Sequence, residues 1–332
     1  MSKKLFITGG TGFLGAYLIK ELVEKGYTVR AIHRNKKFPF FIEPRILKQV
    51  QWVTGDILDV VSLYEGMEGM DAVIHAAAKV SFHPKERKEL FKVNIEGTAN
   101  VVNAAIERNI GRFLHISSVA AIGRTAAGET VTEEKKWQPS KLNTWYALSK
   151  QQAEMEVWRG MGEGLNVVVA NPTTILGYGD WNTTSCAIFK TAYNEFPWYT
   201  TGVNGFVNVE DVAKASVLLM ESEYSGERFI INGDNWSFQQ LLNTIADGLG
   251  KKRPHKEATP FLGAVAWRME KLKSVFSGKR PLLTRQSARV AQSKTYFDNQ
   301  KLLQHLPGFQ FTPLAQTIQQ ASKRYAANLQ SL

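Results

Sequence analysis

The sequence predicts an α/β protein in which a doubly wound parallel β-sheet is joined to a smaller, mostly helical lobe. Short apolar segments alternate with segments of helical periodicity along much of the chain, as in strands that are joined by crossover helices. A glycine-rich turn separates the first strand from the first helix. Small or polar residues follow several of the other strands, at the edge where such sheets bind ligands.

The first strand and the first helix enclose the glycine-rich turn. Leu5–Thr8 is a short apolar run, and residues 11–24 carry apolar side chains at helical spacing. Between them, Gly9 allows a tight turn, Gly12 lets a pyrophosphate approach the backbone, and Gly15 lets the helix pack on the strand. Free N–H groups and the helix dipole attract phosphate there, so the turn favours a Rossmann-type dinucleotide site over an ordinary glycine turn.

The second strand, Tyr27–His33, ends where this type of domain places the residue that contacts the adenosine ribose. An Asp or Glu there selects NAD, and this chain has Arg34 instead. A guanidinium can bind a 2′-phosphate through two hydrogen bonds, so Arg34 favours NADP over NAD. The alternative is a solvated basic loop, which fits the neighbouring Lys36 and Lys37 better than Arg34.

The next two strands are also followed by candidate ligand contacts. After Gln51–Thr54, Asp56 can bind the adenine amino group and Ile57 can cover its ring, or the aspartate can cap the next helix. After Ala72–His75, the small residues Ala76-Ala77-Ala78 allow either a ligand to lie against the backbone or a helix to pack closely. Both alternatives stay open for each segment.

A predicted helix over residues 86–108 carries Asn94 and leads to the fifth strand, Arg112–Ile116, which ends at Ser118. The sixth strand is Asn166–Ala170. The carboxyl ends of parallel strands share one edge of the sheet. The glycine turn and the residues after each strand should therefore converge on one site.

Tyr146 and Lys150 stand one helical turn apart, so both side chains can point into one cleft. A free tyrosine has a pKa of about 10, and a nearby ammonium should lower it. Ser118 can hydrogen-bond a substrate oxygen on which charge develops. This pattern is typical of proton transfer beside a hydride-carrying cofactor, whereas an exposed Tyr and Lys on an amphipathic helix would have no chemistry.

These residues resemble the extended short-chain dehydrogenase/reductase family over essentially the whole chain. The matching segments are the glycine turn, Gly55-Asp56-Ile57, His75–Ala78, Asn94–Thr98, Ser117-Ser118, Tyr146–Lys150 and Val207–Ala213. The resemblance implies a catalytic group of Ser118, Tyr146 and Lys150, with Tyr146 as the proton donor. It also implies that Asn94 supports the site through its helix backbone.

Candidate cofactor contacts lie in the glycine turn, after the strands and on the catalytic helix. They are Gly9, Thr11, Gly12, Phe13, Leu14, Gly15, Arg34, Asp56, Ile57, Ala76, Ala77, Ala78, Tyr146, Lys150, Pro172, Thr173, Thr174 and Ile175.

The segment Asn171–Gly177 distinguishes two branches of this family. Nucleotide-sugar epimerases and dehydratases usually carry an arginine after the sixth strand and hold NAD permanently, whereas this chain has Asn171-Pro172. It looks like the dihydroflavonol-4-reductase-like branch, which implies NADP-dependent reduction of an aldehyde or ketone, or oxidation of the matching alcohol. The two alternatives are a nucleotide-sugar epimerase or dehydratase with bound NAD, and a regulatory NADP-binding protein without catalysis.

We expect residues 1–177 and 205–233 to form the NADP-binding core, and residues 178–204 and 234–332 to form the substrate lobe. Aromatic residues are frequent in residues 178–204, and they can form either an apolar pocket or the core of the lobe. The candidate substrate contacts are Phe82, Ser118, Tyr178 and Trp181. Such a pocket would suit a small apolar or aromatic carbonyl compound.

Composition narrows the class of protein. The chain has 332 residues, 44% of them hydrophobic, and one cysteine, Cys186, so no internal disulfide can form. We expect no metal site, because no cluster of Cys and His accompanies the strands. The amino terminus leads directly into the first strand, and no apolar stretch is long enough to span a bilayer. We therefore expect a cytoplasmic protein.

The net charge of +11 is concentrated near the carboxyl terminus, where residues 251–332 hold 15 Lys and Arg against 3 Asp and Glu. No nucleic-acid-binding motif accompanies this charge, so we expect no nucleic-acid partner. Residues 261–279 have amphipathic helical spacing and can lie on a membrane or cover the substrate, and we expect a cover over the substrate. The resemblance also implies a possible homodimer through the Asn94 and Tyr146 helices.

Overall fold

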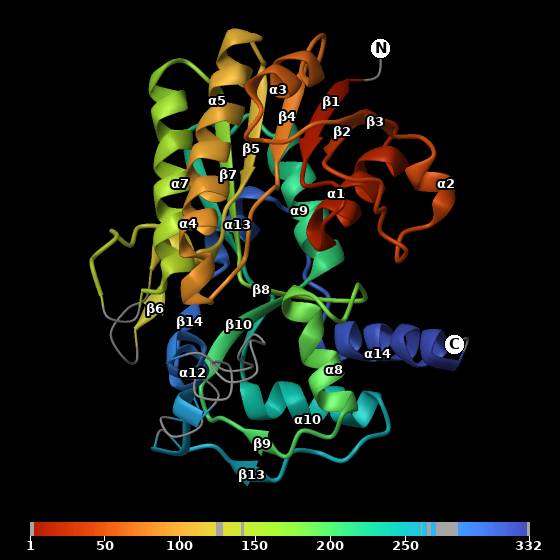
Figure 1. Ribbon diagram of the computed structural model, residues 1–332, viewed down its shortest axis with the longest axis vertical. Coiled ribbons are helices and arrows are strands. Elements are labelled where there is room, and N and C mark those ends of the chain that lie inside the picture. The colour runs from red at the N-terminus through yellow and green to blue at the C-terminus, as the bar shows by residue number, and fades with distance from the viewer. Residues whose placement is uncertain are drawn as a thin grey trace.

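The computed structural model describes residues 3–123, 129–140, 143–259, 261–263, 267–269 and 285–330. A parallel sheet of seven strands has helices on both faces, and a smaller lobe lies beyond the carboxyl ends of its strands (Figure 1). The strand order is β3–β2–β1–β4–β5–β7–β11. The strands are β1 (Lys4–Thr8), β2 (Thr28–His33), β3 (Gln51–Thr54), β4 (Ala72–His75), β5 (Arg112–Ile116), β7 (Val167–Pro172) and β11 (Glu227–Ile231).

This architecture confirms the doubly wound Rossmann fold that the sequence predicts. Strands β3, β4 and β5 begin and end at the predicted residues, and the predicted ends of β1, β2 and β7 differ by at most two residues. Neighbouring strands are parallel throughout. Their carboxyl ends therefore share one edge, which is where the candidate site residues were expected.

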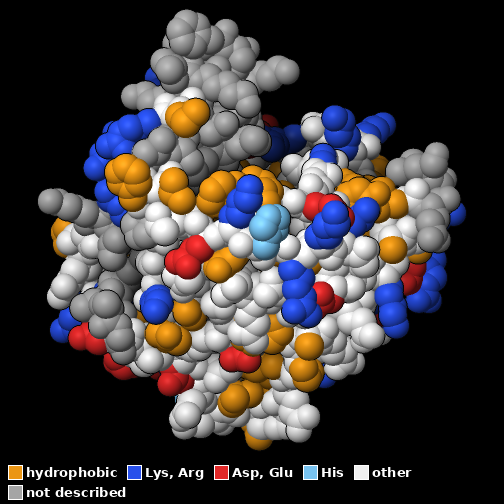
Figure 2. Space-filling view, turned by 90° about the horizontal axis from the view of Figure 1, so that it is seen from below, with side chains coloured by type: hydrophobic (Ala, Val, Ile, Leu, Met, Phe, Trp, Pro, Cys, Tyr) orange, Lys and Arg blue, Asp and Glu red, His pale blue; other side chains and the backbone are white. Residues whose placement is uncertain are grey.

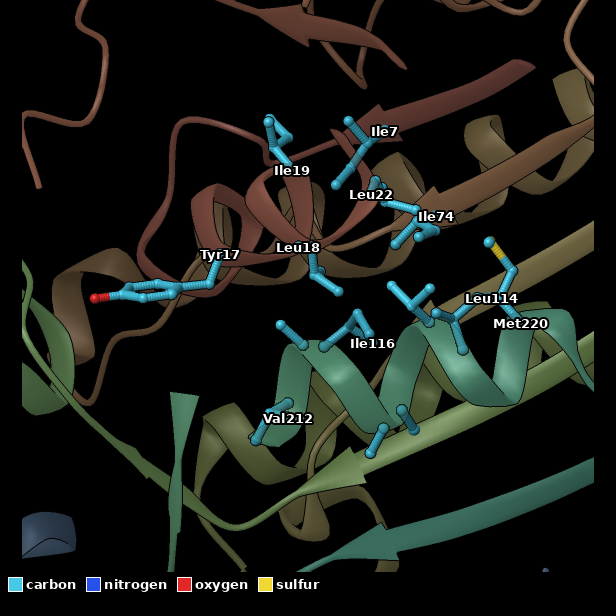
Figure 3. Packing of buried hydrophobic residues seen from close by; sticks show 14 of the residues in the cluster. Ile7, Tyr17, Leu18, Ile19, Leu22, Ile74, Leu114, Ile116, Val212 and Met220 are labelled. Carbon is cyan, nitrogen blue, oxygen red and sulfur yellow. The ribbon is translucent and has the colours of Figure 1, made fainter. Parts of the chain in front are cut away.

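One face of the sheet is covered by α1 (Phe13–Glu24) and α9 (Val209–Glu221), which pack against each other. Figure 3 shows Ile7 of β1, Leu18 of α1 and Val212 of α9 in a single aliphatic cluster. All three are fully buried. The alternation of side chains along each strand sends Ile7 to this face.

The opposite face is covered by α3 (Val60–Gly66), α5 (Gly97–Glu107) and α7 (Trp145–Gly162). Phe6, next to Ile7 in β1, points to this side and is fully buried. The shorter helices of this half of the chain are α2 (Pro44–Leu47), α4 (Arg87–Phe91) and α6 (Val119–Ile122).

The predicted single helix over residues 86–108 is interrupted. The structure divides it into η1 (Pro84–Glu86), α4, a π-helical turn η2 (Lys92–Glu96) and α5. Asn94 lies in the π-helical turn, and its side-chain amide makes three hydrogen bonds outside the helix. Helical periodicity cannot reveal such a turn, which is frequent at functional sites.

The smaller lobe is built from short strands and four helices. A three-stranded sheet contains β8 (Thr174–Leu176), β10 (Val203–Asn208) and β12 (Asp234–Ser237), and two-stranded pairs are formed by β9 (Trp198–Tyr199) with β13 (Lys256–Glu257) and by β6 (Thr130–Val131) with β14 (Tyr296–Phe297). Its described helices are α8 (Ala187–Tyr193), α10 (Phe238–Gly248), α12 (Arg285–Gln292) and α14 (Leu314–Gln330), with a short helix η3 (Thr184–Cys186) before α8.

Helix α13 (Gln300–His305) departs from the sequence-based domain boundary. That boundary assigns residues 234–332 to the small lobe, but α13 packs on β11 of the main sheet, and Leu302 is fully buried in its core. The helix has only six residues, and tertiary contacts decide its location.

Figure 2 shows the far end of the small lobe, where Lys and Arg side chains lie among apolar ones. Residues 252, 253 and 256 are basic and exposed there. Of the predicted amphipathic segment 261–279, residues 264–266 and 270–279 lie outside the described part of the chain. Among the residues that the structure describes, no helix has the length and apolar character to cross a membrane.

Candidate active site

The glycine turn has the geometry that a dinucleotide site requires. Gly9 has a φ of 74°, and its carbonyl accepts a hydrogen bond of 2.9 Å from the Gly12 N–H. A Cβ on Gly9 would lie 2.6 Å from the Ala77 nitrogen, and a Cβ on Gly15 would overlap the Gly9 carbonyl oxygen. Helix α1 begins after Gly12 without a side-chain cap. Its first N–H groups are therefore available to an anion.

The candidate adenosine contacts differ in exposure. Arg34 follows β2, is exposed, and makes no hydrogen bond or ion pair with any residue that the structure describes. The Asp56 carboxylate accepts a 3.0 Å hydrogen bond from a backbone N–H two residues on, whereas Asp59 caps α3. Ile57 is buried, and its side chain lies against Gly97 of α5. The helix-cap alternative for Asp56 is therefore wrong.

Helix α7 begins after Thr144, whose hydroxyl accepts a 3.0 Å hydrogen bond from a backbone N–H three residues on. Lys150 lies on this helix and is 2% exposed. Its Nζ donates a 3.0 Å hydrogen bond to the carbonyl oxygen of Ile116, at the end of β5. Burial lowers the pKa of Lys150 to about 8, and the Glu154 carboxylate partly offsets this effect.

The Tyr146 hydroxyl hydrogen-bonds the Ser118 side chain, and the Phe82 ring lies 5.9 Å from the Tyr146 ring in an edge-on arrangement. Burial raises the pKa of Tyr146, and the hydrogen bond with Ser118 offsets part of this shift. The sequence predicts that Lys150 lowers the phenol pKa. In the structure the net shift of the Tyr146 pKa is upward, and Lys150 donates to the Ile116 carbonyl at the end of β5.

Asn94 connects the π-helical turn to the start of α7. Its Oδ1 accepts from the Lys79 N–H at 2.7 Å, and its Nδ2 donates to the Lys79 carbonyl at 3.0 Å. The same Nδ2 donates to the Ser149 hydroxyl at 2.9 Å, and Ser149 donates to the Tyr146 carbonyl. In this structure, Asn94 therefore contacts the site through its side chain.

A buried row of hydrogen bonds joins the end of β1 to the π-helical turn. The Thr8 hydroxyl and His75 Nδ1 lie 2.7 Å apart, and His75 Nε2 lies 2.9 Å from the Thr98 hydroxyl. Thr98 in turn donates to the Asn94 carbonyl at 2.6 Å. Burial lowers the pKa of His75 to about 3, so its ring is neutral. His75 is thus a packed residue with both ring nitrogens hydrogen-bonded.

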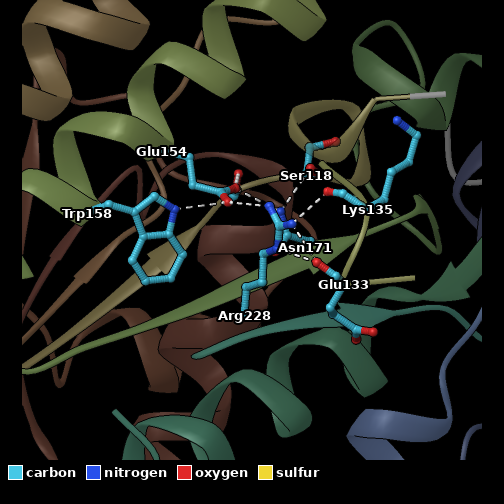
Figure 4. A network of polar contacts seen from close by, with 8 residues as sticks. Ser118, Glu133, Lys135, Glu154, Trp158, Asn171 and Arg228 are labelled. Atoms are coloured by element: carbon cyan, nitrogen blue, oxygen red, sulfur yellow. Dashed lines mark hydrogen bonds and ion pairs between the residues drawn. The ribbon is translucent and has the colours of Figure 1, made fainter. Parts of the chain in front are cut away.

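Glu154 and Arg228 are site residues that the sequence analysis did not identify. Figure 4 shows the Glu154 carboxylate near Ser118, with Asn171 and Arg228 beside it. Asn171 donates to both Glu154 and the Ser118 carbonyl. The sequence contains a signal for Glu154, because Tyr146, Lys150 and Glu154 recur at intervals of four on one helix face. No local pattern identifies Arg228, which lies in β11.

The segment after Asn171 crosses from β7 into β8. Pro172 ends β7, and the buried Thr173 hydroxyl donates a 3.1 Å hydrogen bond to the Asn232 side-chain oxygen. Thr174 accepts a 2.7 Å hydrogen bond from a neighbouring asparagine, and Ile175 packs against the core of the main sheet. Candidate cofactor contacts in this segment therefore already have structural partners on their side chains.

Tyr178 and Trp181 contact other residues than Phe82 does. Both pack on Tyr325 of α14, with ring centroids 4.8 Å and 5.6 Å from it. They also belong to the apolar cluster of the small lobe. These contacts match the alternative in which the aromatic residues form the lobe core. Within the described residues, no group of His, Cys, Asp and Glu has the arrangement of a metal site.

Comparisons with known proteins agree with this geometry. The family model described as the NAD dependent epimerase/dehydratase family matches residues 5–232. A putative dihydroflavonol 4-reductase from a Synechocystis species is 32% identical over 314 residues, which cover 92% of this chain and 90% of that protein. Cinnamoyl-CoA reductase 1 of Petunia hybrida is 33% identical, over 68% of this chain and 71% of its own length.

Among solved structures, the UDP-glucose 4-epimerase of Thermotoga maritima has a TM-score of 0.79 and 20% identity, covering 98% of this chain and 99% of that one. This likeness concerns the fold alone. The family match, the two reductase relatives and the arrangement around the glycine turn lead to one conclusion. The chain is an enzyme of the NAD-dependent epimerase/dehydratase family, which binds a nicotinamide cofactor, and it belongs to the dihydroflavonol-4-reductase-like branch.

Proposed function

We propose that this enzyme uses NADP to reduce the carbonyl group of a small apolar or aromatic aldehyde or ketone, or to oxidise the matching alcohol. The observation that carries this proposal is the pairing of the Tyr146 phenol with the Ser118 hydroxyl, one helical turn from buried Lys150. A proton donor and a hydrogen-bond donor for one substrate oxygen are thus side by side.

The residues around the glycine turn suit a dinucleotide. The uncapped start of α1 offers N–H groups to the pyrophosphate, and Gly9 and Gly15 leave no room for side chains between the turn and its neighbours. Arg34 is exposed and unpaired among the described residues. Its guanidinium is therefore available to bind a 2′-phosphate. When bound, the nicotinamide supplies or accepts the hydride.

The chain itself moves the proton. In reduction, the Tyr146 hydroxyl donates its proton to the substrate oxygen, while the Ser118 hydroxyl stabilises the charge that develops there. The raised pKa of Tyr146 keeps the phenol protonated at neutral pH, as a proton donor requires. The Lys150 ammonium, one helical turn from Tyr146, would stabilise the phenolate after transfer. Phe82, whose ring meets Tyr146, would contact the apolar part of the substrate.

The first experiment identifies the substrate class. The protein is mixed with NADPH and a panel of aliphatic and aromatic aldehydes and ketones, and the loss of NADPH absorbance is followed. We expect turnover with apolar or aromatic carbonyl compounds. NAD that remains bound through purification, with no reduction of any carbonyl, would instead favour the nucleotide-sugar epimerase or dehydratase alternative.

The second experiment tests the cofactor preference. NADPH should bind more tightly than NADH, and Arg34→Asp should reverse or abolish this difference, at a cost of about 1–3 kcal/mol for NADPH. Titration of protein fluorescence with each cofactor measures both affinities. Lys37→Asp is a control, because Lys37 is also basic and exposed in the same loop. Equal affinities of the unaltered chain for the two cofactors would contradict the role of Arg34.

A homodimer through α5 and α7 stays a prediction. These two helices lie side by side on the outside of the sheet (Figure 1). A mass measurement in dilute solution tests it, and a single 37.2 kDa species would contradict it.

A further inference from the structure

Glu154 is a buried carboxylate with donors from four directions. Glu154 as a whole is 3% exposed. One oxygen accepts from the Ser117 hydroxyl at 2.6 Å and from the Asn171 amide at 2.9 Å. The other accepts from the Trp158 ring N–H at 3.3 Å and from Arg228 at 3.4 Å. So many donors around one group hold the carboxylate in a fixed position.

These donors come from the elements that form the proposed active site. Ser117 precedes Ser118 at the end of β5, and Asn171 lies in β7 and donates with the same amide nitrogen to the Ser118 carbonyl at 3.0 Å. Arg228 of β11 also donates to the carbonyl oxygens of Glu133 and Lys135 (Figure 4). Glu154 therefore joins the Ser118 turn and the catalytic helix, and through Arg228 it reaches the loop that follows β6.

Lys150 lies one helical turn before Glu154, and both are buried. A lysine that leaves water tends to lose its proton, and a nearby carboxylate opposes this loss. The Glu154 carboxylate raises the pKa of Lys150, against the lowering by burial. Among the groups that influence Lys150, Glu154 is the one that favours its charged form.

The other titratable groups that face Lys150 do not supply this charge. His75 of β4 and His115 of β5 interact with Lys150, and burial lowers the pKa of both rings, so they are neutral near pH 7. On the helical side, Asn94 of the π-helical turn does not titrate. Tyr146, one turn earlier on α7, has a raised pKa and is neutral as well.

We propose that Glu154 is a positioning residue that keeps the buried Lys150 side chain charged and holds the Ser118 turn against the catalytic helix. The charged lysine would then donate hydrogen bonds to the cofactor ribose and stabilise the Tyr146 phenolate. This role rests on the proposed function only where catalysis is measured, that is, in kcat/KM. Its effect on cofactor affinity is independent of any carbonyl substrate.

Glu154→Gln tests the charge while it keeps the side-chain length. The affinity for NADPH, with NADH for comparison, is measured from pH 6 to pH 10 by quenching of tryptophan fluorescence. In the unaltered chain the affinity should fall as Lys150 loses its proton, with a midpoint near the value of about 8 for the cofactor-free protein or above it. In Glu154→Gln the midpoint should fall by about one pH unit or more. The alkaline limb of kcat/KM should move in the same direction.

Glu156→Gln is the matched control. Glu156 lies on the same helix and pairs with Arg159 at the surface, where charges are screened by solvent. The same change of charge there should leave both pH profiles unmoved. If Glu154→Gln and Glu156→Gln have the midpoint of the unaltered chain, the proposal is overturned.

Arg228→Gln separates an electrostatic role from a structural one, and it also serves if Glu154→Gln does not fold. Without the Arg228 guanidinium, the Glu154 charge acts on Lys150 alone. The pH midpoint of NADPH binding should therefore rise slightly. A structural defect would weaken binding at every pH without moving the midpoint, and that result would overturn the proposal. If no carbonyl compound is reduced but the binding midpoints move as expected, the proposed function fails while the role of Glu154 stands.

Discussion

The main sheet and the small lobe bury their side chains in different ways. On the sheet, Ile7 packs among aliphatic side chains of the parallel strands and of the helices that cover this face, from Leu18 of α1 to Val212 of α9. In the small lobe, Tyr325 from the last helix packs on the rings of Tyr178, Trp181 and Phe189, well over a hundred residues earlier. The first core is therefore built mainly from aliphatic side chains between a sheet and its covering helices, and the second largely from aromatic rings around one tyrosine.

Polar groups show the same contrast. Beneath the glycine turn, Thr8, His75 and Thr98 are buried in a continuous row of hydrogen bonds, and Glu154 is surrounded by donors. In the small lobe, the Tyr325 hydroxyl accepts from the Gly179 N–H and donates to the Gly177 carbonyl. The sheet edge therefore has a buried polar row under the candidate site, whereas the surroundings of Tyr325 in the lobe are mainly aromatic rings. The four changes below test this difference, from the largest expected effect to the smallest.

Gly15→Ala should prevent stable folding of the dinucleotide turn, because the new Cβ would overlap the Gly9 carbonyl oxygen in a backbone that cannot move aside. Such overpacking costs about 3 kcal/mol or more. Soluble yield and denaturant unfolding measure it. Gly162→Ala is the control, since a Cβ there meets no atom within 4 Å, and it should be harmless. A normally stable Gly15→Ala protein would contradict the close packing of α1 on the turn.

Tyr146→Phe removes the hydroxyl that interacts with Ser118 and keeps the ring that meets Phe82. Turnover of any accepted carbonyl compound should fall by about a hundredfold or more, the usual scale for loss of a general acid. NADPH affinity should stay nearly unchanged. Lys150→Ala should instead reduce both turnover and affinity. Near-normal turnover in Tyr146→Phe, checked by steady-state kinetics, would leave the protein without the assigned proton donor.

Trp181→Ala distinguishes the two interpretations of the aromatic residues. As part of the lobe core, stacked on Tyr325, it should cost about 3 kcal/mol of unfolding free energy and leave KM nearly unchanged. Phe196→Ala is the control, because Phe196 is 52% exposed and should matter little. A tenfold rise in KM with unchanged thermal stability would restore Trp181 to the substrate site.

Acid should weaken the core through His75. Its pKa is about 3 in the folded chain and about 6.5 when unfolded, so the unfolded state binds the proton first. The contribution of neutral His75 to the free energy of unfolding is fully present above pH 6.5 and is lost as the pH falls toward 3. The loss amounts to about 2 kcal/mol between pH 7 and pH 5. His75→Gln should flatten this dependence in urea titrations, whereas exposed His255→Gln should not. An equal slope in all three proteins would exclude His75 as the source.

The sequence by itself determined the parallel sheet and indicated the candidate site at its edge. Mostly apolar runs between turns indicated β4 and β5 to the residue, because a parallel strand that is buried on both faces needs such a segment. Glycine at positions 9 and 15 indicated the close turn, since any side chain there would collide with backbone. The spacing of Tyr146 and Lys150 indicated one helix face, because helical geometry alone sets it.

Only the tertiary structure decided the contacts that join distant segments. The π-helical turn at Asn94 depends on Lys79 and Ser149, which lie on other elements, so local periodicity cannot show it. The hydrogen bonds of Glu154 with Asn171 and Arg228 arise because β7 and β11 are neighbours in the sheet. In the same way, the last helix reaches Tyr178 and Trp181 only after the chain has folded, and its Tyr325 ring then packs on both of them. Such contacts depend on which strands and helices become neighbours, and spacing along the chain does not carry that information.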